Sequence, residues 1–156
     1  MGKPEVAVLM GSKSDSEVME RAASVLARFG VEYSTHVLSA HRTPEKTRDF
    51  AREARKKGFK VIIAGAGMAA HLAGAVASET TLPVIGVPMA GSAVGGLDAL
   101  LATVQMPAGV PVATVAIGGS GAHNAAVLAV EILALSDAGL RKKLAAYKKE
   151  LAGGAG

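Results

Sequence analysis

The sequence contains no cysteine and no tryptophan, and aromatic residues make up only 3% of its 156 residues. Without cysteine the chain can form neither disulfide bonds nor thiolate metal ligands. This composition fits a reducing compartment, so we expect a cytoplasmic protein. The scarcity of aromatic side chains argues against stacking on nucleic-acid bases and against a flavin site flanked by rings. Half of the residues are hydrophobic, so the core must be built from Ala, Val, Leu and Ile.

Long hydrophobic runs are also missing. The first apolar run, residues 6–10, ends at Gly11. It is too short for a signal sequence or a membrane span, so we expect a soluble protein with no membrane partner. The length predicts a single domain over residues 1–156 that is large enough to bury a core. Residues 153–156, three glycines and an alanine, are expected to form a disordered tail.

The charge balance is moderately basic, with 17 Lys and Arg against 13 Asp and Glu. The basic residues cluster at 48–60 and 141–149, where acidic residues are interleaved. Solvated helix faces explain this pattern better than a nucleic-acid surface, which would carry its positive charge on one face. The mean hydropathy of +0.35 is high for a small monomer. It predicts apolar surface that a homo-oligomer would cover.

Apolar runs alternate with helical periodicity along the whole chain. We expect a helix after the first strand with Val18, Ala22 and Val25 on its buried face, a capping box at residues 14–17 and a stop at Gly30. The expected strands are 6–10, 31–38, 61–64, 84–87 and 112–117, and the later helices are 45–57, 72–79, 97–104, 124–135 and 138–151.

This alternation predicts an α/β protein: a three-layer α/β/α sandwich with a flavodoxin-like, doubly wound, five-stranded parallel sheet and an extra C-terminal helix. Ligands of such sheets bind beyond the carboxyl ends of the strands, at the switch point. Three of these ends carry polar or glycine-rich corners, at residues 11–15, 39–42 and 65–71. In the strand order 2-1-3-4-5 the corners follow adjacent strands, and we expect them to converge on one crevice.

The second corner carries the clearest chemical signal. Pro44 suits the first position of a helix, and Thr43 can cap the same turn. Ser39 and Ala40 therefore lie at a strand-to-helix corner that favours an anion. His41, which can carry protons near neutral pH, stands beside Arg42, which can grip a phosphate. The corner predicts chemistry on a phosphorylated small molecule, and the alternative is a capped helix with polar surface residues.

The first corner matches neither a P-loop nor the GxGxxG fingerprint, which argues against nucleoside triphosphates and NAD. Ser12 and Ser14 offer hydroxyl groups, and Asp15 offers only acceptors. We expect Asp15 to hold ribose hydroxyls while Arg42 holds the phosphate. The alternative is that Ser14 and Asp15 simply cap the first helix.

The third corner is rich in small residues, which let backbone approach a ligand closely. Gly65, Gly67 and Ala70 lead to His71 and Leu72 at the start of a helix. The alternative role for His71 is to fix the corner by a hydrogen bond. His36 is expected to be a packing or edge residue.

His123 is expected to be a capping or surface group, and no HxH or HExxH pattern predicts a metal site. A phosphoacceptor receiver domain needs acidic residues at the ends of the first and third strands, where this chain has Gly11 and Gly65. A scaffold module stays possible, but it would not explain His and Arg at a glycine-lined crevice.

Six motifs occur in order and at matching spacing: GSKSD at 11–15, SAHRTP at 39–44, AGAG at 64–67, AAHL at 69–72, LPVIGVP at 82–88 and QMP at 105–107. Together they resemble the class I PurE family, the N5-carboxyaminoimidazole ribonucleotide mutases of bacterial de novo purine (IMP) synthesis. The resemblance runs over nearly the whole chain, and its first two motifs are highly specific.

The resemblance implies a flavodoxin-like subunit in a homo-octamer with sites at subunit contacts. It also implies a reaction without metal, ATP or biotin, in which a carboxylate moves from N5 to C4 of the ribonucleotide. By the resemblance, Ser12, Asp15 and Arg42 bind the ribose phosphate, and His41 shuttles the proton. The segment 65–72, with His71, encloses the migrating carboxyl group.

The chain departs from the family pattern at two positions of the third corner. Met68 stands where the family usually has Gly, and Ala73 where it usually has Pro. Met68 could narrow the carboxyl pocket or face a subunit contact. The related class II enzymes carboxylate aminoimidazole ribonucleotide directly with CO2, but they typically differ at the RTP and AAHL motifs. Both motifs are intact here, which favours the mutase.

Overall fold

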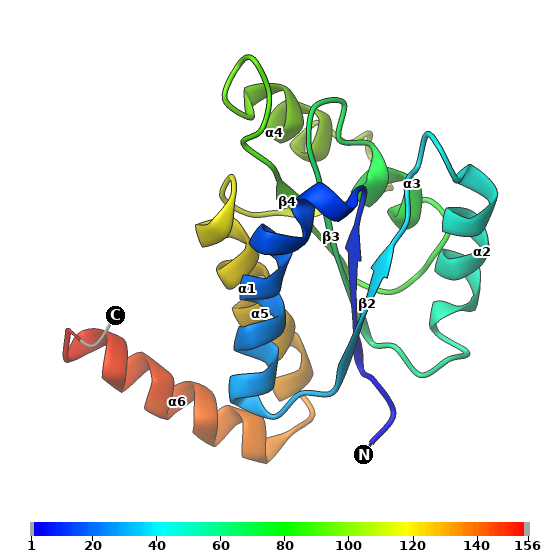
Figure 1. Ribbon diagram of the computed structural model, residues 1–156. Coiled ribbons are helices and arrows are strands. Elements are labelled where there is room, and N and C mark those ends of the chain that lie inside the picture. The colour runs from blue at the N-terminus through cyan, green and yellow to red at the C-terminus, as the bar shows by residue number, and fades with distance from the viewer. Residues whose placement is uncertain (1, 155–156) are drawn as a thin grey trace.

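The computed structural model describes residues 2–154 as an α/β fold around one parallel sheet (Figure 1). The sheet has the order β2-β1-β3-β4-β5, as predicted. All four pairs of neighbouring strands are parallel. The strands are β1 (Val6–Met10), β2 (Tyr33–Val37), β3 (Val61–Ala66), β4 (Val84–Pro88) and β5 (Ala113–Thr114).

Helices cover both faces of this sheet. Figure 1 shows α1 and α5 on one face and α2 and α3 on the other, while α6 runs outward from the body of the molecule. The helices are α1 (Ser16–Phe29), α2 (Pro44–Ala54), α3 (Leu72–Ala77), α4 (Leu97–Val104), α5 (Gly119–Ala134) and α6 (Ala138–Ala152), with a 3₁₀ turn, η1 (Lys13–Asp15), before α1. None of them, within residues 2–154, has the length and apolar character needed to cross a bilayer.

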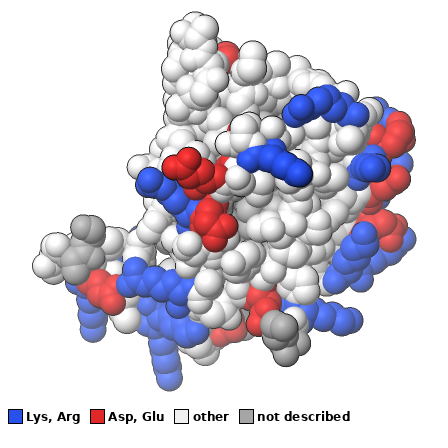
Figure 2. Space-filling view, in the orientation of Figure 1, with Lys and Arg blue, Asp and Glu red and all other residues white. Residues whose placement is uncertain are grey.

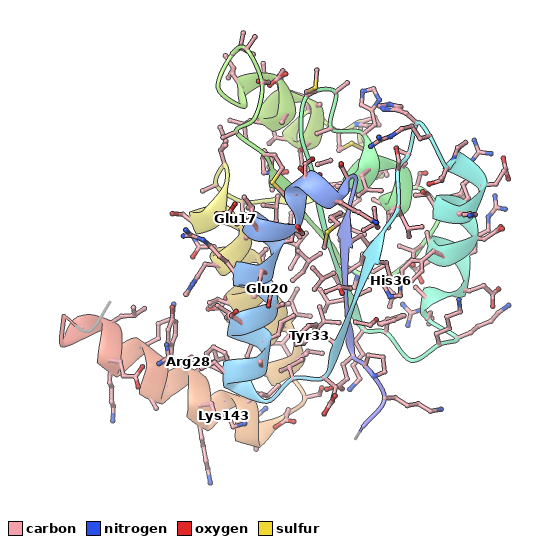
Figure 3. All side chains as sticks on the ribbon, in the orientation of Figure 1. Glu17, Glu20, Arg28, Tyr33, His36 and Lys143 are labelled. Carbon is pink, nitrogen blue, oxygen red and sulfur yellow. The ribbon has the colours of Figure 1, made fainter. Side chains whose placement is uncertain are left out.

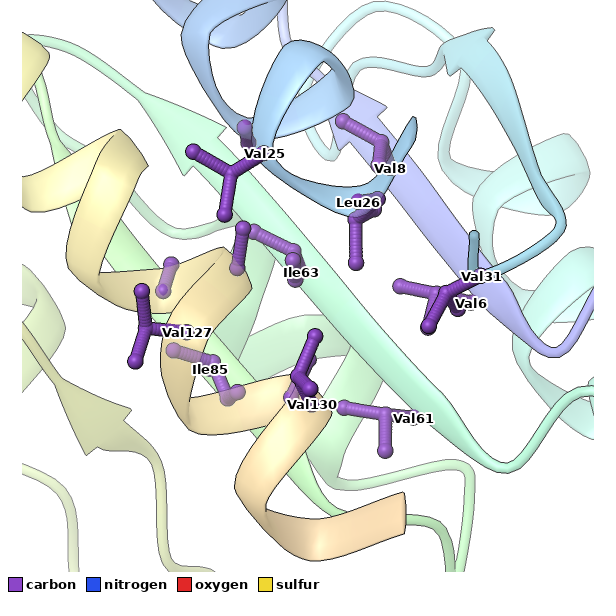
Figure 4. Packing of buried hydrophobic residues seen from close by; sticks show 14 of the residues in the cluster. Val6, Val8, Val25, Leu26, Val31, Val61, Ile63, Ile85, Val127 and Val130 are labelled. Carbon is purple, nitrogen blue, oxygen red and sulfur yellow. The ribbon is translucent and has the colours of Figure 1, made fainter. Parts of the chain in front are cut away.

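The core consists of two apolar layers, one on each face of the sheet. Successive residues of a strand point to opposite faces, so Val6 and Val8 join the layer under α1 and α5, whereas Ala7 and Leu9 join the layer under α2 and α3. Figure 4 shows Val25 and Leu26 of α1 packed with residues of α5 over β3 and β4. The two-sided burial explains why the strands read as unbroken apolar runs.

Several boundaries differ from the sequence prediction for reasons visible in the backbone. The strand β5 has only two residues instead of six. It is an edge strand, and β4 ends in Pro88, which has no N–H to extend the ladder. The strand β2 begins two residues late because the N–H of Val31 still bonds to Leu26 at the end of α1.

The helix α5 starts at Gly119, five residues earlier than predicted. Gly121 makes this possible, because a Cβ there would lie 1.6 Å from the carbonyl oxygen of Ala116. At the other end of the chain, Gly153 and Gly154 donate backbone hydrogen bonds to the last turn of α6. The remainder of the expected tail, residues 155–156, lies outside the described residues.

Candidate active site

The three predicted corners lie side by side at one edge of the sheet. Met10 at the end of β1 is in register with Val37 of β2 and with Gly65 of β3. One step further, the N–H of Gly11 donates to the carbonyl of Gly65 at 3.0 Å. The strand order therefore brings together turns that lie up to sixty residues apart in the sequence.

The first corner is a compact turn built by its own polar side chains. The hydroxyl of Ser12 accepts bonds from the N–H and the hydroxyl of Ser14, at 3.3 and 3.0 Å. The carboxylate of Asp15 accepts the N–H of Ser12 at 3.1 Å. This is a capping box on η1. The predicted box at residues 14–17 is wrong, because η1 comes before α1 and Asp15 caps α1 without a side-chain bond.

Asp15 is half-buried in this turn. Burial raises the pKa of its carboxyl group above the ordinary value, while the Ser12 N–H and the positive charge of Arg42 pull the pKa down less strongly. A carboxylate in this setting gains by accepting further hydrogen bonds, which is what the hydroxyl groups of a sugar donate.

The second corner is tied to the first by Arg42. Its Nη2 donates to the carbonyl of Gly11 at 3.1 Å, and its Nε lies 3.4 Å from the hydroxyl of Ser39. The Ser39 hydroxyl also accepts the backbone N–H of Arg42 at 3.0 Å. The guanidinium group is exposed, so it presents a positive charge at the mouth of the corner. Ala40 lies half-buried between these residues.

Thr43 has the N-cap position of α2 that the sequence predicts, but its side chain makes no capping bond. Its hydroxyl instead accepts the N–H of Ser39 at 3.0 Å and donates to the carbonyl of Ser39 at 3.1 Å. Pro44 is at the first helical position, as expected. The corner is thus fixed by Ser39 and Thr43 together.

The two histidines of the site contact each other. Nε2 of His41 lies 2.7 Å from Nδ1 of His71, and the ring centroids are 4.7 Å apart with an interplanar angle of 79°. Both side chains are exposed. A proton can therefore be shared between an imidazole of the second corner and one of the third. The sequence placed both residues at the site but held no signal for a contact across 30 positions.

The third corner packs closely on buried methionines. A Cβ on Gly65 would lie 2.4 Å from Sδ of Met19 and 2.5 Å from Cε of Met89, and one on Gly67 would lie 3.3 Å from Cβ of Met89. A side chain at position 65 would force the ends of both methionine side chains to move. The side chains of Ala70 and Leu72 are buried, with Leu72 in the layer under α2 and α3. These two residues can face a ligand through their backbone only.

The remaining histidines lie away from this edge. Nε2 of His36 on β2 is 2.8 Å from the hydroxyl of Ser34, and its ring packs on Phe50 and Phe59. Burial and, to a smaller extent, the charge of Lys57 lower the pKa of His36. It is the packing residue that the sequence predicts.

His123 lies within α5, and its Nε2 is 2.9 Å from the hydroxyl of Tyr147 on α6, so it joins two helices and does not cap one. Residues 2–154 contain no cluster of three His, Asp or Glu side chains that could hold a metal ion.

Charged side chains also lie along α1 and over α2. A shallow cavity of about 490 Å³ is lined by α1 residues and His123, and Figure 3 shows Glu17, Glu20 and Arg28 along α1 on this side. Figure 2 shows interleaved acidic and basic groups over α2 and a mostly uncharged surface over α4. The interleaving agrees with solvated helix faces.

A parallel sheet in the order β2-β1-β3-β4-β5 with helices on both faces defines the class of doubly wound α/β proteins, whose ligands bind beyond the carboxyl ends of the strands. The chain belongs within that class to the AIR carboxylase family, whose model matches residues 5–153.

Relatives cover nearly the whole chain. The protein is 55% identical to the N5-carboxyaminoimidazole ribonucleotide mutase of Saccharolobus solfataricus, over 95% of this chain and 92% of that one. It is 57% identical to the mutase of Mycobacterium leprae, over 96% of this chain and 86% of the relative. The crystal structure of Treponema denticola PurE superposes with a TM-score of 0.87 at 30% identity, covering 97% of this chain and 94% of that chain.

Proposed function

We propose that the protein is an N5-carboxyaminoimidazole ribonucleotide mutase. It moves the carboxylate of its substrate from the exocyclic N5 to ring carbon C4, an isomerisation in de novo purine synthesis. The observation that carries the proposal is the histidine pair His41–His71 at the same sheet edge as Arg42 and Asp15. The edge thus combines a proton-transfer group with an anchor for a ribonucleotide.

The first two corners bind the ribose phosphate in this proposal. Arg42 holds the phosphate, because its guanidinium group is exposed and charge-assisted bonds to phosphate are strong. Asp15 accepts ribose hydroxyls, and the hydroxyls of Ser12 and Ser14 add donors. Ser39 and Ala40 form the turn that orients Arg42. A ribonucleotide held by Arg42 would lie next to the ring of His41, because the two residues are neighbours in the chain.

His41 moves the proton. In its charged form it donates a proton to N5 as the N5–carboxylate bond breaks and CO2 leaves. C4 then attacks CO2, and neutral His41 takes the C4 proton and restores aromaticity. Imidazole is the side chain best suited to act first as an acid and then as a base near neutral pH. His71, 2.7 Å away, can accept or return that proton. No cofactor takes part, because the carboxyl group leaves and rejoins the same molecule.

The third corner encloses the carboxyl group. Gly65 and Gly67 let the backbone approach it, and the segment from Ala70 to Leu72 closes the corner. Residues 65–70 carry no charged or hydroxyl side chain that would hold water beside CO2. The close packing of Gly65 on Met19 and Met89 supports a closely packed wall behind this corner.

The assembly proposed is a homo-octamer of single-domain subunits in the cytoplasm. An apolar stripe at α4 supports the self-association: Val94, Leu97, Leu101 and Val104 are between 47% and 60% exposed. The last three of these residues repeat at helical spacing and form one face. A second copy of the chain would bury this face and narrow the access to the exposed histidines. Sedimentation velocity tests this proposal, and a stable monomer would contradict it.

A direct carboxylase that joins CO2 to aminoimidazole ribonucleotide is the second candidate, because the family description is AIR carboxylase. The deciding experiment offers the purified protein two substrates in turn: the N5-carboxylated ribonucleotide at low bicarbonate, and the decarboxylated ribonucleotide with bicarbonate. A mutase converts the first, a carboxylase needs the second, and a non-catalytic nucleotide-binding module converts neither.

A further inference from the structure

One residue of the third corner adopts a backbone conformation that its side chain disfavours. Met68 has φ of +55°, and it is the only non-glycine residue with positive φ within residues 2–154. A methionine there is strained, because its Cβ crowds the following carbonyl group in the left-handed region. Glycine would adopt the same conformation without that strain.

Burial of the Met68 side chain does not offset this strain. It is 64% exposed, whereas Met19 and Met89, on which the same corner packs, are 1% and 4% exposed. The turn itself is closed by backbone bonds from Ala70 N–H to the Met68 carbonyl and from His71 N–H to the Ala69 carbonyl, both 2.8 Å. Neither bond involves the thioether. The fold alone therefore gives no reason for a large apolar side chain at this position.

Its location gives a reason. Met68 lies three residues before His71, in the corner that follows β3 at the edge shared with Gly11 and Arg42. The two histidines of the site are exposed in the single chain. An apolar, unbranched side chain with free torsions at this rim can lie over a bound ligand and move aside for release.

We propose that Met68 is a positioning residue that retains CO2 between the two halves of the reaction. The inference rests on the mutase function proposed above. When the N5–C bond breaks, N5 takes the proton from His41 and the freed carboxyl group becomes neutral CO2. The C4–C bond then forms from the ring electron pair, and His41 recovers a proton from C4. The thioether covers CO2 during this interval and offers water no strong hydrogen bond, so capture by C4 outcompetes escape.

The experiment uses substrate labelled with ¹⁴C in its carboxylate, in buffer with unlabelled bicarbonate. The fraction of label kept in the C4-carboxylated product is compared among the wild type, Met68→Gly, Met68→Leu and, as a control, Leu135→Ala, an exposed leucine just beyond α5. We expect Met68→Gly to lose label several-fold more often per turnover, with its melting temperature unchanged or raised. Met68→Leu restores retention, and Leu135→Ala matches the wild type.

Equal label retention in Met68→Gly and the wild type would overturn the inference. A change in sedimentation coefficient that accounts for the lost label would overturn it too, because Met68 would then act as a subunit contact. Should Met68→Gly fold poorly, Met68→Ala keeps the comparison open, since it also removes the thioether. A wild-type protein that converts neither ribonucleotide would refute the mutase itself, a result separable from both of these.

Discussion

The contact between His41 and His71 supports a quantitative prediction about their separate roles. Replacing His41 by Asn removes the only group proposed to donate and take the proton, and a positioned acid–base group contributes about 10²- to 10⁴-fold to rate. We expect His41→Asn to lower kcat by that factor. Both histidine side chains are exposed, so His41→Asn and His71→Ala should each lower the free energy of unfolding by no more than the bond between them contributes, about 1–1.5 kcal/mol. Loss of activity then cannot be ascribed to unfolding.

Replacing His71 should lower kcat less than replacing His41 does. The hydrogen bond between the two rings sets the expected factor. The 2.7 Å separation of the ring nitrogens is short for a hydrogen bond. Such a bond contributes about 1–1.5 kcal/mol, which corresponds to about five- to thirteenfold in rate. We expect His71→Ala to lower kcat by that factor. His71→Asn places an amide near the position of Nδ1, so it should recover activity if His71 only orients His41.

A double-mutant cycle tests the pairing. Since His71 acts through His41, adding His71→Ala to His41→Asn should cost no further activity. The assay is steady-state turnover of the N5-carboxylated ribonucleotide across pH, with thermal unfolding of each variant as the control. Equal losses from His71→Ala in the two backgrounds would refute the pairing, and normal turnover by His41→Asn would refute the shuttle.

Three further predictions concern packing, charge and assembly. Gly65→Ala should lower the free energy of unfolding by about 1–3 kcal/mol, because the new methyl group overpacks two buried methionines. Urea unfolding measures this change. The control is Gly91→Ala, because a Cβ at position 91 meets nothing within 4 Å. The raised pKa of Asp15 means that its stabilising contribution is complete at low pH and is lost as pH rises through the folded-state pKa. Asp15→Asn should therefore be as stable as the wild type at low pH and at least as stable at neutral pH, yet bind the ribonucleotide more weakly; a variant less stable than the wild type only at neutral pH would contradict this. Leu101→Glu should dissociate the assembly by charging the apolar face of α4, and an unchanged sedimentation coefficient would locate the subunit contact elsewhere.

Much of the fold could be predicted from local sequence patterns. Residues 6–10 and 84–87 are apolar runs bounded by Gly or Pro, and the helix over 97–104 agrees with its prediction at both ends. These predictions succeeded because burial on both faces of a parallel sheet leaves a continuous apolar signature. The two-residue length of β5 could not be predicted from its own sequence, because it depends on Pro88 in the neighbouring strand.

The residue types of the site could be predicted from the sequence, but the contacts between them could not. Ser12, Asp15, His41 and Arg42 are chemically distinctive wherever they occur, and the motifs that contain them indicate the family. Which hydroxyl caps which turn was misjudged, because η1 competes with α1 for the residues between Gly11 and Ser16.

The sequence by itself determined the alternation of strands and helices, the apolar core and the chemical groups available at the strand ends, because these depend on residue type and short-range spacing. Only the tertiary structure decided that Arg42 reaches the carbonyl of Gly11, that His41 meets His71 and that Met68 is strained yet exposed. Contacts of this kind are set by the order and register of the strands, which place side chains from distant turns within bonding distance, and no local pattern encodes that distance.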